Sequence, residues 1–320
     1  MRVLVTGASG FLGRAVIEDL AASNSSVRAL GGPRSPAAPA WRAGPIEYAA
    51  CDLVAAEDMS PLVEGVDAVV HLAARSDRHP GTADAQRLYR AINVDATLRL
   101  ARAAARAGVA KFVFLSSVYV NGDESGSAPF GETDEPSPQG LYGRSKFEAE
   151  SGLRRIAAET GMSTVIVRPP IVVGPSPRGS MALLCRLIRA GLPLPFSSIN
   201  NLRNVAGLRN VVAFTVGCLS ASLPPGCETF LICDQPALST PDLIRRLARF
   251  LNRPARLTPM PETMLQAGAR LMGQEARLGA LWKSQAISTA KAESQLGWRQ
   301  PVSLDGTLEI AANGFLSAVR

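Results

Sequence analysis

The sequence predicts an α/β protein built on a doubly wound parallel sheet. Apolar segments near residues 2–6, 26–30, 46–49, 67–73, 110–116 and 163–168 alternate with stretches of helical periodicity. This alternation is typical of right-handed β-α-β crossovers. A glycine-rich turn directly follows the first apolar segment, and prolines become frequent after Pro169-Pro170. We therefore expect a Rossmann-type domain over residues 1–173 and a smaller C-terminal mixed α/β lobe over residues 174–320, with the chain able to cross back between them.

The glycine-rich turn T-G-A-S-G-F-L-G spans residues 6–13, where the first strand leads into the first helix. Its glycines allow backbone amides to approach a diphosphate, and the helix N-terminus then faces that charge. The strand before the turn and the apolar helix after it are the context that this fingerprint requires. The alternative is a structural turn that only closes a strand–helix corner. The residues predicted to contact a dinucleotide here are Gly7, Ser9, Gly10, Phe11, Leu12 and Gly13.

The elements that follow include two unusually long helices, predicted over residues 82–107 and 140–160. The first is rich in Ala and Arg. Paired helices of this kind can pack against a second subunit as a homodimer, and a solvent-facing helix with a small-residue side is the alternative. In the second lobe, Thr229 to Cys233 forms one clear strand.

Composition favours small anionic ligands. Lys and Arg total 34 against 27 Asp and Glu, which gives a net charge of +7. The arginines are spread along the chain without interleaved aromatic residues, so nucleic acid is a poor candidate partner. Five cysteines without a C-x-x-C pair argue against a disulfide framework or a zinc site. No signal peptide or membrane-spanning run is recognisable, and we expect a cytoplasmic protein without a membrane partner.

Tyr142 and Lys146 stand four residues apart and therefore share one face of a helix. A phenol with a pKa near ~10 is a weak base at neutral pH, but a nearby ammonium and a positive nicotinamide ring favour its ionised form. The pair thus predicts a proton shuttle that accompanies hydride transfer. Ser117, at the end of the strand 110–116, can hydrogen-bond the reacting oxygen. Alternatively, Ser116 and Ser117 only cap the strand end.

Several motifs occur in the order and spacing of one known family. They are T-G-A-S-G-F-L-G at 6–13, C-D-L at 51–53, H-L-A-A at 71–74, N-V-D-A-T at 93–97, L-S-S at 115–117, Y-G-R-S-K at 142–146 and R-P-P at 168–170. With these motifs the chain resembles, over almost its whole length, an extended short-chain dehydrogenase/reductase of the nucleotide-sugar epimerase/dehydratase family.

The resemblance implies roles for particular residues. Ser117, Tyr142 and Lys146 would be the catalytic triad, with Lys146 also bonded to the nicotinamide ribose, and His71 would be a strand-end residue without a catalytic role. The further dinucleotide-binding residues that the resemblance implies are Asp52 and Leu53 at the adenine, Leu72, Ala73 and Ala74 along the cofactor, and Asn93 and Pro169.

The cofactor prediction depends on the end of the second strand. An NAD-specific site usually has an acidic residue there, whereas this chain has Gly31-Gly32-Pro33-Arg34. Because a guanidinium suits a 2′-phosphate, Arg34 favours NADP(H), with NAD(H) possible. The alternative is that Arg34 is a solvated loop residue.

Two departures from the family pattern bear on the reaction. The chain has S-S-V-Y-V-N-G at 116–122 and R-P-P-I at 168–171. With I-N-N-L-R-N at 199–204 and Q-L-G-W at 295–298, these segments resemble bacterial 4-ketoreductases that act on UDP-N-acetyl-6-deoxyhexosamines. The resemblance implies reduction of a UDP-4-keto-6-deoxy-N-acetylhexosamine at C4. Arg203 would bind the sugar-nucleotide diphosphate, Phe196 would shape the uracil pocket, and Ser117 and Tyr142 would contact the sugar.

Two alternatives remain open. One is a UDP-sugar 4-epimerase with bound NAD. The other is a protein of a different class, one that binds NADP as a sensor or structural subunit and catalyses nothing.

Overall fold

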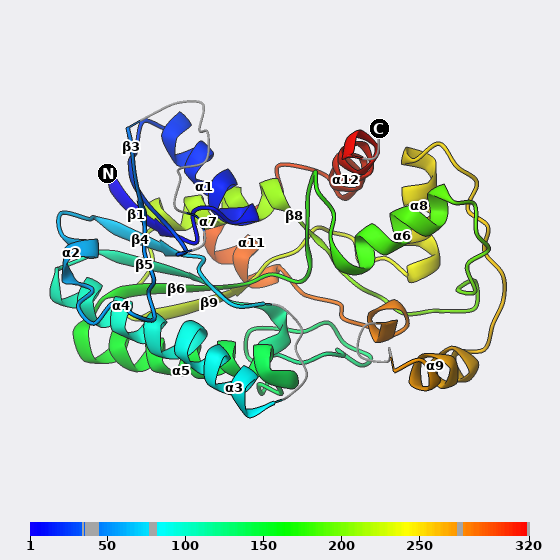
Figure 1. Cartoon of the computed structure of the whole chain (residues 1–320), viewed down its shortest axis with the longest axis horizontal. Helices are drawn as coiled ribbons and strands as arrows, with labels where there is room; N and C mark the ends of the chain where they lie inside the picture. The colour runs from blue at the N-terminus through cyan, green and yellow to red at the C-terminus, as the bar shows by residue number, and fades with distance from the viewer. Residues whose placement is uncertain (34, 36–44, 77–81, 274–277, 319–320) are drawn as a thin grey trace.

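A computed structural model describes residues 1–33, 35, 45–76, 82–273 and 278–318. Its main feature is a seven-stranded parallel sheet of order β3-β2-β1-β4-β5-β6-β9, which confirms the predicted doubly wound α/β fold (Figure 1). The strands are β1 (Arg2–Thr6), β2 (Ser26–Gly31), β3 (Ile46–Ala50), β4 (Ala68–His71), β5 (Lys111–Leu115), β6 (Ser163–Arg168) and β9 (Cys227–Leu231).

Helices cover both faces of this sheet because its strands are apolar on both sides. Along β1, Val3 and Val5 face one helical layer and Leu4 faces the other. The first layer contains α1 (Phe11–Ala22), α7 (Leu208–Ser220) and α11 (Ala290–Leu296). The second contains α2 (Ser60–Val63), α4 (Ala96–Arg106) and α5 (Gly140–Thr160). Figure 1 shows α1 and α5 on opposite sides of the strands.

The two long helices differ from each other. The predicted helix 140–160 is α5, unbroken along its whole length. The predicted helix 82–107 consists of α3 (Ala83–Arg90), a π-helical segment (Ala91–Asp95) and α4, which follow one another without a break. A π-helical turn changes the direction in which its side chains point relative to the adjoining α-helix. Such turns are frequent at functional sites. Here the turn carries Asn93.

The second lobe has its own hydrophobic core. It is built from α6 (Gly179–Arg189), α8 (Thr240–Phe250), α9 (Glu262–Leu271) and α12 (Leu304–Ala318). A two-stranded sheet, β7 (Val172–Val173) with β8 (Ala206–Gly207), leads into it. No helix among the described residues is long and apolar enough to cross a membrane.

The placement of one predicted strand was wrong. The strand expected at Thr229 to Cys233 in the second lobe is β9, which pairs in parallel with β6 and completes the main sheet. Phe230 joins the core under α7, whereas Leu231 packs on the opposite side with Val118. A strand buried on both faces gains most inside the larger sheet. The chain therefore crosses back from the second lobe to the first through α7, β9 and α11.

Candidate active site

The glycine turn after β1 is packed so closely that side chains are excluded from it. Gly7 has a φ of +71°, and a Cβ added there would lie 2.9 Å from the backbone nitrogen of Ala73. A Cβ at Gly13 would lie 2.1 Å from the carbonyl oxygen of Gly7. Helix α1 thus begins directly against the turn, and the turn lies directly against the segment that follows β4.

The N-terminus of α1 fits a bound diphosphate. Gly10 precedes the helix in an extended conformation, and within the described part of the chain no side chain caps the helix. The first intrahelical bond runs from Arg14 N to Gly10 O at 3.1 Å, so the amides of the first helical residues, 11–13, have no carbonyl of the helix to bind. The first turn carries no acidic residue. These amides, together with Ser9, Phe11 and Leu12 around them, would hold the diphosphate of a dinucleotide.

The other predicted cofactor residues lie after neighbouring strands, at the carboxyl edge of the sheet. Ala73 N donates to Thr6 Oγ1 at 3.2 Å, which fixes Leu72, Ala73 and Ala74 beside the glycine turn. Asp52 Oδ1 accepts from Val54 N at 2.9 Å, and the Leu53 carbonyl accepts from Arg99 at 2.7 Å. The Pro169 carbonyl accepts from Val118 N at 3.0 Å. Arg34 lies outside the described residues.

Asn93 binds other parts of the protein through both ends of its side-chain amide. Its Oδ1 accepts from Arg75 N at 2.8 Å, and its Nδ2 donates to Arg75 O at 3.0 Å and to Ser145 Oγ at 2.9 Å. The π-helical segment therefore connects the loop after β4 to α5. A direct contact between Asn93 and a cofactor stays a prediction.

The end of β2 has a feature that the sequence did not reveal. A Cβ at Gly31 would lie 2.0 Å from the phenol oxygen of Tyr48, so the Tyr48 side chain would have to move to admit a larger residue. The Tyr48 phenol donates to the carbonyl of Ser35. The Tyr48 ring thus covers the position where NAD-specific sites usually have a carboxylate.

Ser117, Tyr142 and Lys146 are brought together between β5 and α5. The Ser117 side chain lies close enough to Tyr142 to act on the pKa of its phenol. Lys146 is 2% exposed; its Nζ donates to the Leu115 carbonyl at 2.7 Å and lies 4.3 Å from the centre of the Phe114 ring. The triad proposed from the sequence is therefore a compact group at the carboxyl end of the fifth strand.

Gly143 is a site residue that the sequence analysis missed. A Cβ there would lie 2.7 Å from the carbonyl oxygen of Tyr119, so only glycine lets α5 approach the loop that carries Ser117. Its position between Tyr142 and Lys146 in the sequence gives no sign of this contact, since the partner is more than twenty residues away.

Burial controls the protonation of the pair. It raises the pKa of Tyr142 to about 12, while the Ser117 hydrogen bond acts in the opposite direction. It also lowers the pKa of Lys146 to about 7, and the Glu150 carboxylate opposes that shift. The sequence predicted that the Lys146 ammonium lowers the pKa of Tyr142. In the structure the protein groups together raise this pKa, because desolvation of the phenol is the largest effect. At neutral pH these groups keep Tyr142 protonated and ready to donate.

His71 has a structural environment, as the sequence resemblance implied. Its ring is fully buried, and its two nitrogens lie 2.7 Å from Thr6 Oγ1 and 2.8 Å from Thr97 Oγ1. Burial lowers the pKa of His71 to about 3, and the nearby Lys146 contributes in the same direction.

The lowered pKa of His71 predicts that the folded protein loses stability in acid. Below pH 6.5 the unfolded chain binds a proton at His71 that the folded protein does not, so stability falls as pH decreases from 6.5 towards 3. We expect a slope of about 1.4 kcal/mol per pH unit from this residue. Urea unfolding of the wild type and of His71→Asn between pH 4.5 and 7.5 measures it. Equal slopes for the two proteins would show that the ring titrates normally.

Two of the predicted substrate residues, Phe196 and Arg203, lie in the second lobe. Phe196 is 7% exposed and belongs to the core of that lobe. Arg203 Nη1 donates to the Lys283 carbonyl at 3.1 Å, and Nη2 donates to Gln285 Oε1 at 2.9 Å. Gln285 Nε2 in turn donates to the Gly122 carbonyl at 3.2 Å. Through Gln285, Arg203 is thus connected to the loop that follows Ser117.

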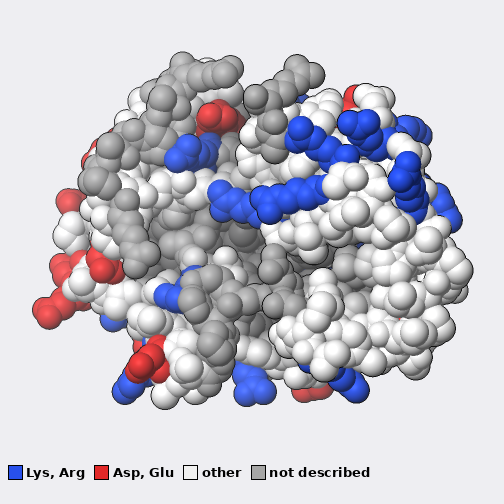
Figure 2. Space-filling model, turned by 45° about the vertical axis from the view of Figure 1, so that its right-hand side comes forward, with Lys and Arg blue, Asp and Glu red and all other residues white. Residues whose placement is uncertain are grey.

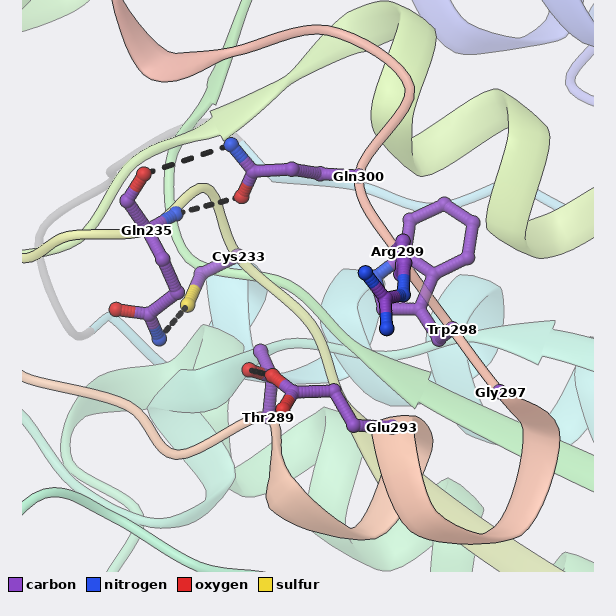
Figure 3. A pocket seen from close by; sticks show the side chains of 8 residues that line it. All are labelled: Cys233, Gln235, Thr289, Glu293, Gly297, Trp298, Arg299 and Gln300. Atoms are coloured by element: carbon purple, nitrogen blue, oxygen red, sulfur yellow. Dashed lines mark hydrogen bonds between the residues drawn. The ribbon is translucent and has the colours of Figure 1, made fainter.

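A separate cavity of about 580 Å³ lies beside the end of β9 (Figure 3). Gln300 closes one side of it, because it accepts from Gln235 N at 2.7 Å and donates to Gln235 O at 3.4 Å. Trp298 and Glu293 form other parts of the wall. None of its lining residues belongs to the predicted site.

Basic side chains gather over the second lobe. Figure 2 shows Lys and Arg over the part of the molecule that contains α6 and α8, while acidic side chains in that view lie mainly on the other side. Some of these arginines are paired: Arg246 and Arg249 both bind Asp305, at 2.6 and 2.8 Å. The positive charge thus accumulates on the lobe expected to bind an anionic sugar nucleotide.

A glycine turn after the first strand and a Ser/Tyr/Lys group at the carboxyl edge of the same parallel sheet are typical of dinucleotide-dependent enzymes with a Rossmann-type fold. The chain belongs to the NAD dependent epimerase/dehydratase family, whose sequence profile matches residues 3–217.

Individual relatives agree with this family. The chain is 31% identical to the "UDP-glucose 4-epimerase" of Vibrio cholerae over 99% of its own length and 96% of that protein. It is 30% identical to the "N-acetyl-alpha-D-glucosaminyl-diphospho-ditrans,octacis-undecaprenol 4-epimerase" of Escherichia coli O157:H7, over 82% of this chain and 77% of that one. The fold is similar to that of the UDP-glucuronic acid 4-epimerase of Bacillus cereus in complex with UDP-glucuronic acid and NAD (TM-score 0.77, 21% identity, 99% of this chain and 100% of the other).

Proposed function

We propose that this protein is a nucleotide-sugar 4-epimerase that inverts C4 of a UDP-hexose. The observation that carries the proposal is the grouping of Ser117 with Tyr142, with Lys146 one helical turn further along α5. The near full-length similarity to a protein named UDP-glucose 4-epimerase favours epimerisation over the reductase reaction that the sequence motifs suggested first.

In this proposal the residues of the chain handle the proton. Tyr142 accepts the proton of the C4 hydroxyl when C4 is oxidised and returns it to the C4 oxygen when the 4-keto sugar is reduced on the opposite face of C4. Ser117 orients the C4 oxygen through its hydroxyl. Lys146 binds the nicotinamide ribose and relays the proton. A bound nicotinamide supplies the hydride acceptor and donor, and its positive charge favours the Tyr142 phenolate that burial opposes.

A 4-ketoreductase is the second candidate, and one contact favours it. The two segments that depart from the epimerase pattern, 116–122 and 168–171, contact each other where Val118 N donates to the Pro169 carbonyl at 3.0 Å. The two departures are therefore one connected feature at the end of β5 and β6. A reductase would use the same triad in one direction only, with Tyr142 as the acid.

The dinucleotide is part of the proposal. Because Gly31 and Gly32 stand at the end of β2, this position has no carboxylate to repel a 2′-phosphate. We therefore keep the preference for NADP(H) over NAD(H). Titration of the protein with both cofactors, followed by protein fluorescence, tests it, and markedly tighter NAD(H) binding would overturn it.

Two further features remain proposals. One is a homodimer through α3, α4 and α5, which light scattering can test. The other is a cytoplasmic location.

The reaction is tested with three substrates. Purified protein is incubated with UDP-galactose and with UDP-N-acetylglucosamine in the presence of NAD or of NADP, and the products are separated by chromatography. A third sample receives NADPH and a UDP-4-keto-6-deoxy-N-acetylhexosamine, and nicotinamide absorbance is followed. We expect C4 epimers in the first two samples. Consumption of NADPH in the third alone supports the reductase, and tight dinucleotide binding with no turnover of any sugar supports the non-catalytic class.

A further inference from the structure

A buried ion pair lies directly behind the triad. The Glu150 and Arg168 side chains are 1% and 3% exposed. Arg168 Nε donates to Glu150 Oε1 at 2.9 Å, and Nη2 donates to Oε2 at 2.5 Å. This two-point contact connects helix α5 to the last residue of β6 in a fixed orientation.

Glu150 and Arg168 also bind the two ends of the loop that contains Ser117. Ser116 Oγ donates to Glu150 Oε1 at 2.5 Å, directly before Ser117. Arg168 Nη1 donates to Asn121 Oδ1 at 2.9 Å, and Asn121 Nδ2 donates to the Gly131 carbonyl at 2.8 Å. Residues 116–121 are thus held by one carboxylate and one guanidinium.

Glu150 lies on the catalytic face of α5. It follows Lys146 by one helical turn and Tyr142 by two, so all three project from the same side. On the sheet side, backbone bonds from Ser116 N to Val167 O at 2.7 Å and from Val118 N to Pro169 O at 3.0 Å hold the loop against the end of β6. The ion pair therefore joins the element that bears Tyr142 and Lys146 to the element that bears Ser117.

Stability alone does not explain such a pair. Desolvation of two charges offsets their attraction, and an apolar pair of similar volume is often as stable or more so. Geometry is a better explanation, because a misplacement of about 1 Å at a reacting group can cost about 100-fold in rate.

We propose that Glu150 and Arg168, with Ser116 and Asn121, form a positioning unit that sets the distance from Ser117 to Tyr142 and Lys146. The unit touches neither substrate nor cofactor, and its catalytic effect rests on the function proposed above.

The unit also sets the charge around Lys146. Glu150 is the carboxylate facing Lys146 from its own helix, and Arg168 faces Glu150 from β6. From the sheet, β5 offers the Leu115 carbonyl and the Phe114 ring, and β4 offers the neutral ring of His71. Burial lowers the pKa of Lys146, and the Glu150 carboxylate raises it. Without the charge of Glu150 the pKa of Lys146 should therefore fall further.

The test compares four variants with the wild type: Glu150→Gln, Arg168→Met, the double variant Glu150→Leu/Arg168→Met, and the control Glu159→Gln. Glu159 lies on the same helix and pairs with Arg102 at 3.4 Å, with both side chains about half exposed. We expect kcat to fall by about 30- to 100-fold in the first three variants, with KM and the dinucleotide Kd changed by less than about threefold. The alkaline limb of the kcat profile should move to lower pH in Glu150→Gln. Glu159→Gln should match the wild type.

The double variant separates positioning from stability. We expect its melting temperature to equal or exceed that of the wild type while kcat stays low. A double variant with wild-type stability and wild-type kcat would overturn the proposal, and so would single variants that lose stability but keep kcat and its pH profile well below their melting temperatures.

Hydrogen exchange tests the unit without any substrate. In the variants, the amides of Ser116, Val118, Asn121 and Gly122 should exchange at least about tenfold faster than in the wild type, because the bonds that hold this loop open more often. Unchanged exchange would overturn the positioning unit. A wild type that turns over no sugar would instead refute the proposed function, and the exchange result would still decide on the unit.

Discussion

Replacement of Tyr142 with Phe should reduce turnover by about 10²- to 10⁴-fold, the range attributed to general acid–base catalysis. In the proposed reaction the phenol carries the proton, and its interaction with Ser117 is lost with it. The ring itself remains, so α5 keeps its packing against the Ser117 loop. We therefore expect dinucleotide affinity within about threefold of the wild type. Turnover at saturating substrate, with fluorescence titration of the cofactor, measures both quantities.

Tyr119→Phe is the matched control. Its ring stacks edge-on against that of Tyr142, with centres 6.4 Å apart, so it removes a phenol from the same place without removing the proposed acid. It should retain turnover within about fivefold of the wild type. Equal losses in both variants would mean that the aromatic cluster matters and that the Tyr142 hydroxyl has no special role.

Gly13→Ala should abolish dinucleotide binding at ordinary cofactor concentrations. The new Cβ would lie 2.1 Å from the Gly7 carbonyl oxygen and 2.8 Å from the Ala8 Cα, both backbone atoms. These backbone atoms cannot move away easily, because Gly7 already lies against the backbone of Leu72 and Ala73. We expect a loss of stability of about 1–3 kcal/mol from overpacking and at least about a 100-fold loss of affinity. Urea unfolding and cofactor titration measure these losses.

Gly217→Ala supplies the control for this substitution. Gly217 lies within α7, and a Cβ there meets no atom within 4 Å. Alanine at an open helical position should stabilise the protein by about 0.5–1 kcal/mol and leave cofactor affinity unchanged. If Gly13→Ala behaves like Gly217→Ala, the turn is not rigid enough to exclude a side chain, and the close packing at Gly13 is not needed for cofactor binding.

The sequence was sufficient for the features that depend on neighbours along the chain. An apolar run forms a strand, glycines allow a tight turn after it, and a spacing of four residues puts Tyr142 and Lys146 on one helical face. Six strands of the main sheet, the helix α5 and the shared face of Tyr142 and Lys146 follow from such local patterns, whereas the grouping of Ser117 with Tyr142 was implied by the family resemblance. Each depends on conformational preferences that act within a few residues.

The tertiary structure was needed where the interaction partner is distant. The position of β9 at the edge of the main sheet, the contact of Gly143 with Tyr119, and the coverage of Gly31 by Tyr48 all join segments with no recognisable relation in the sequence. The same holds for the pKa of Tyr142, since burial is the sum of many remote contacts and here exceeds the effect of nearby polar groups. The ion pair of Glu150 and Arg168 is likewise visible only after folding, because its two charges become neighbours only when α5 packs on β6.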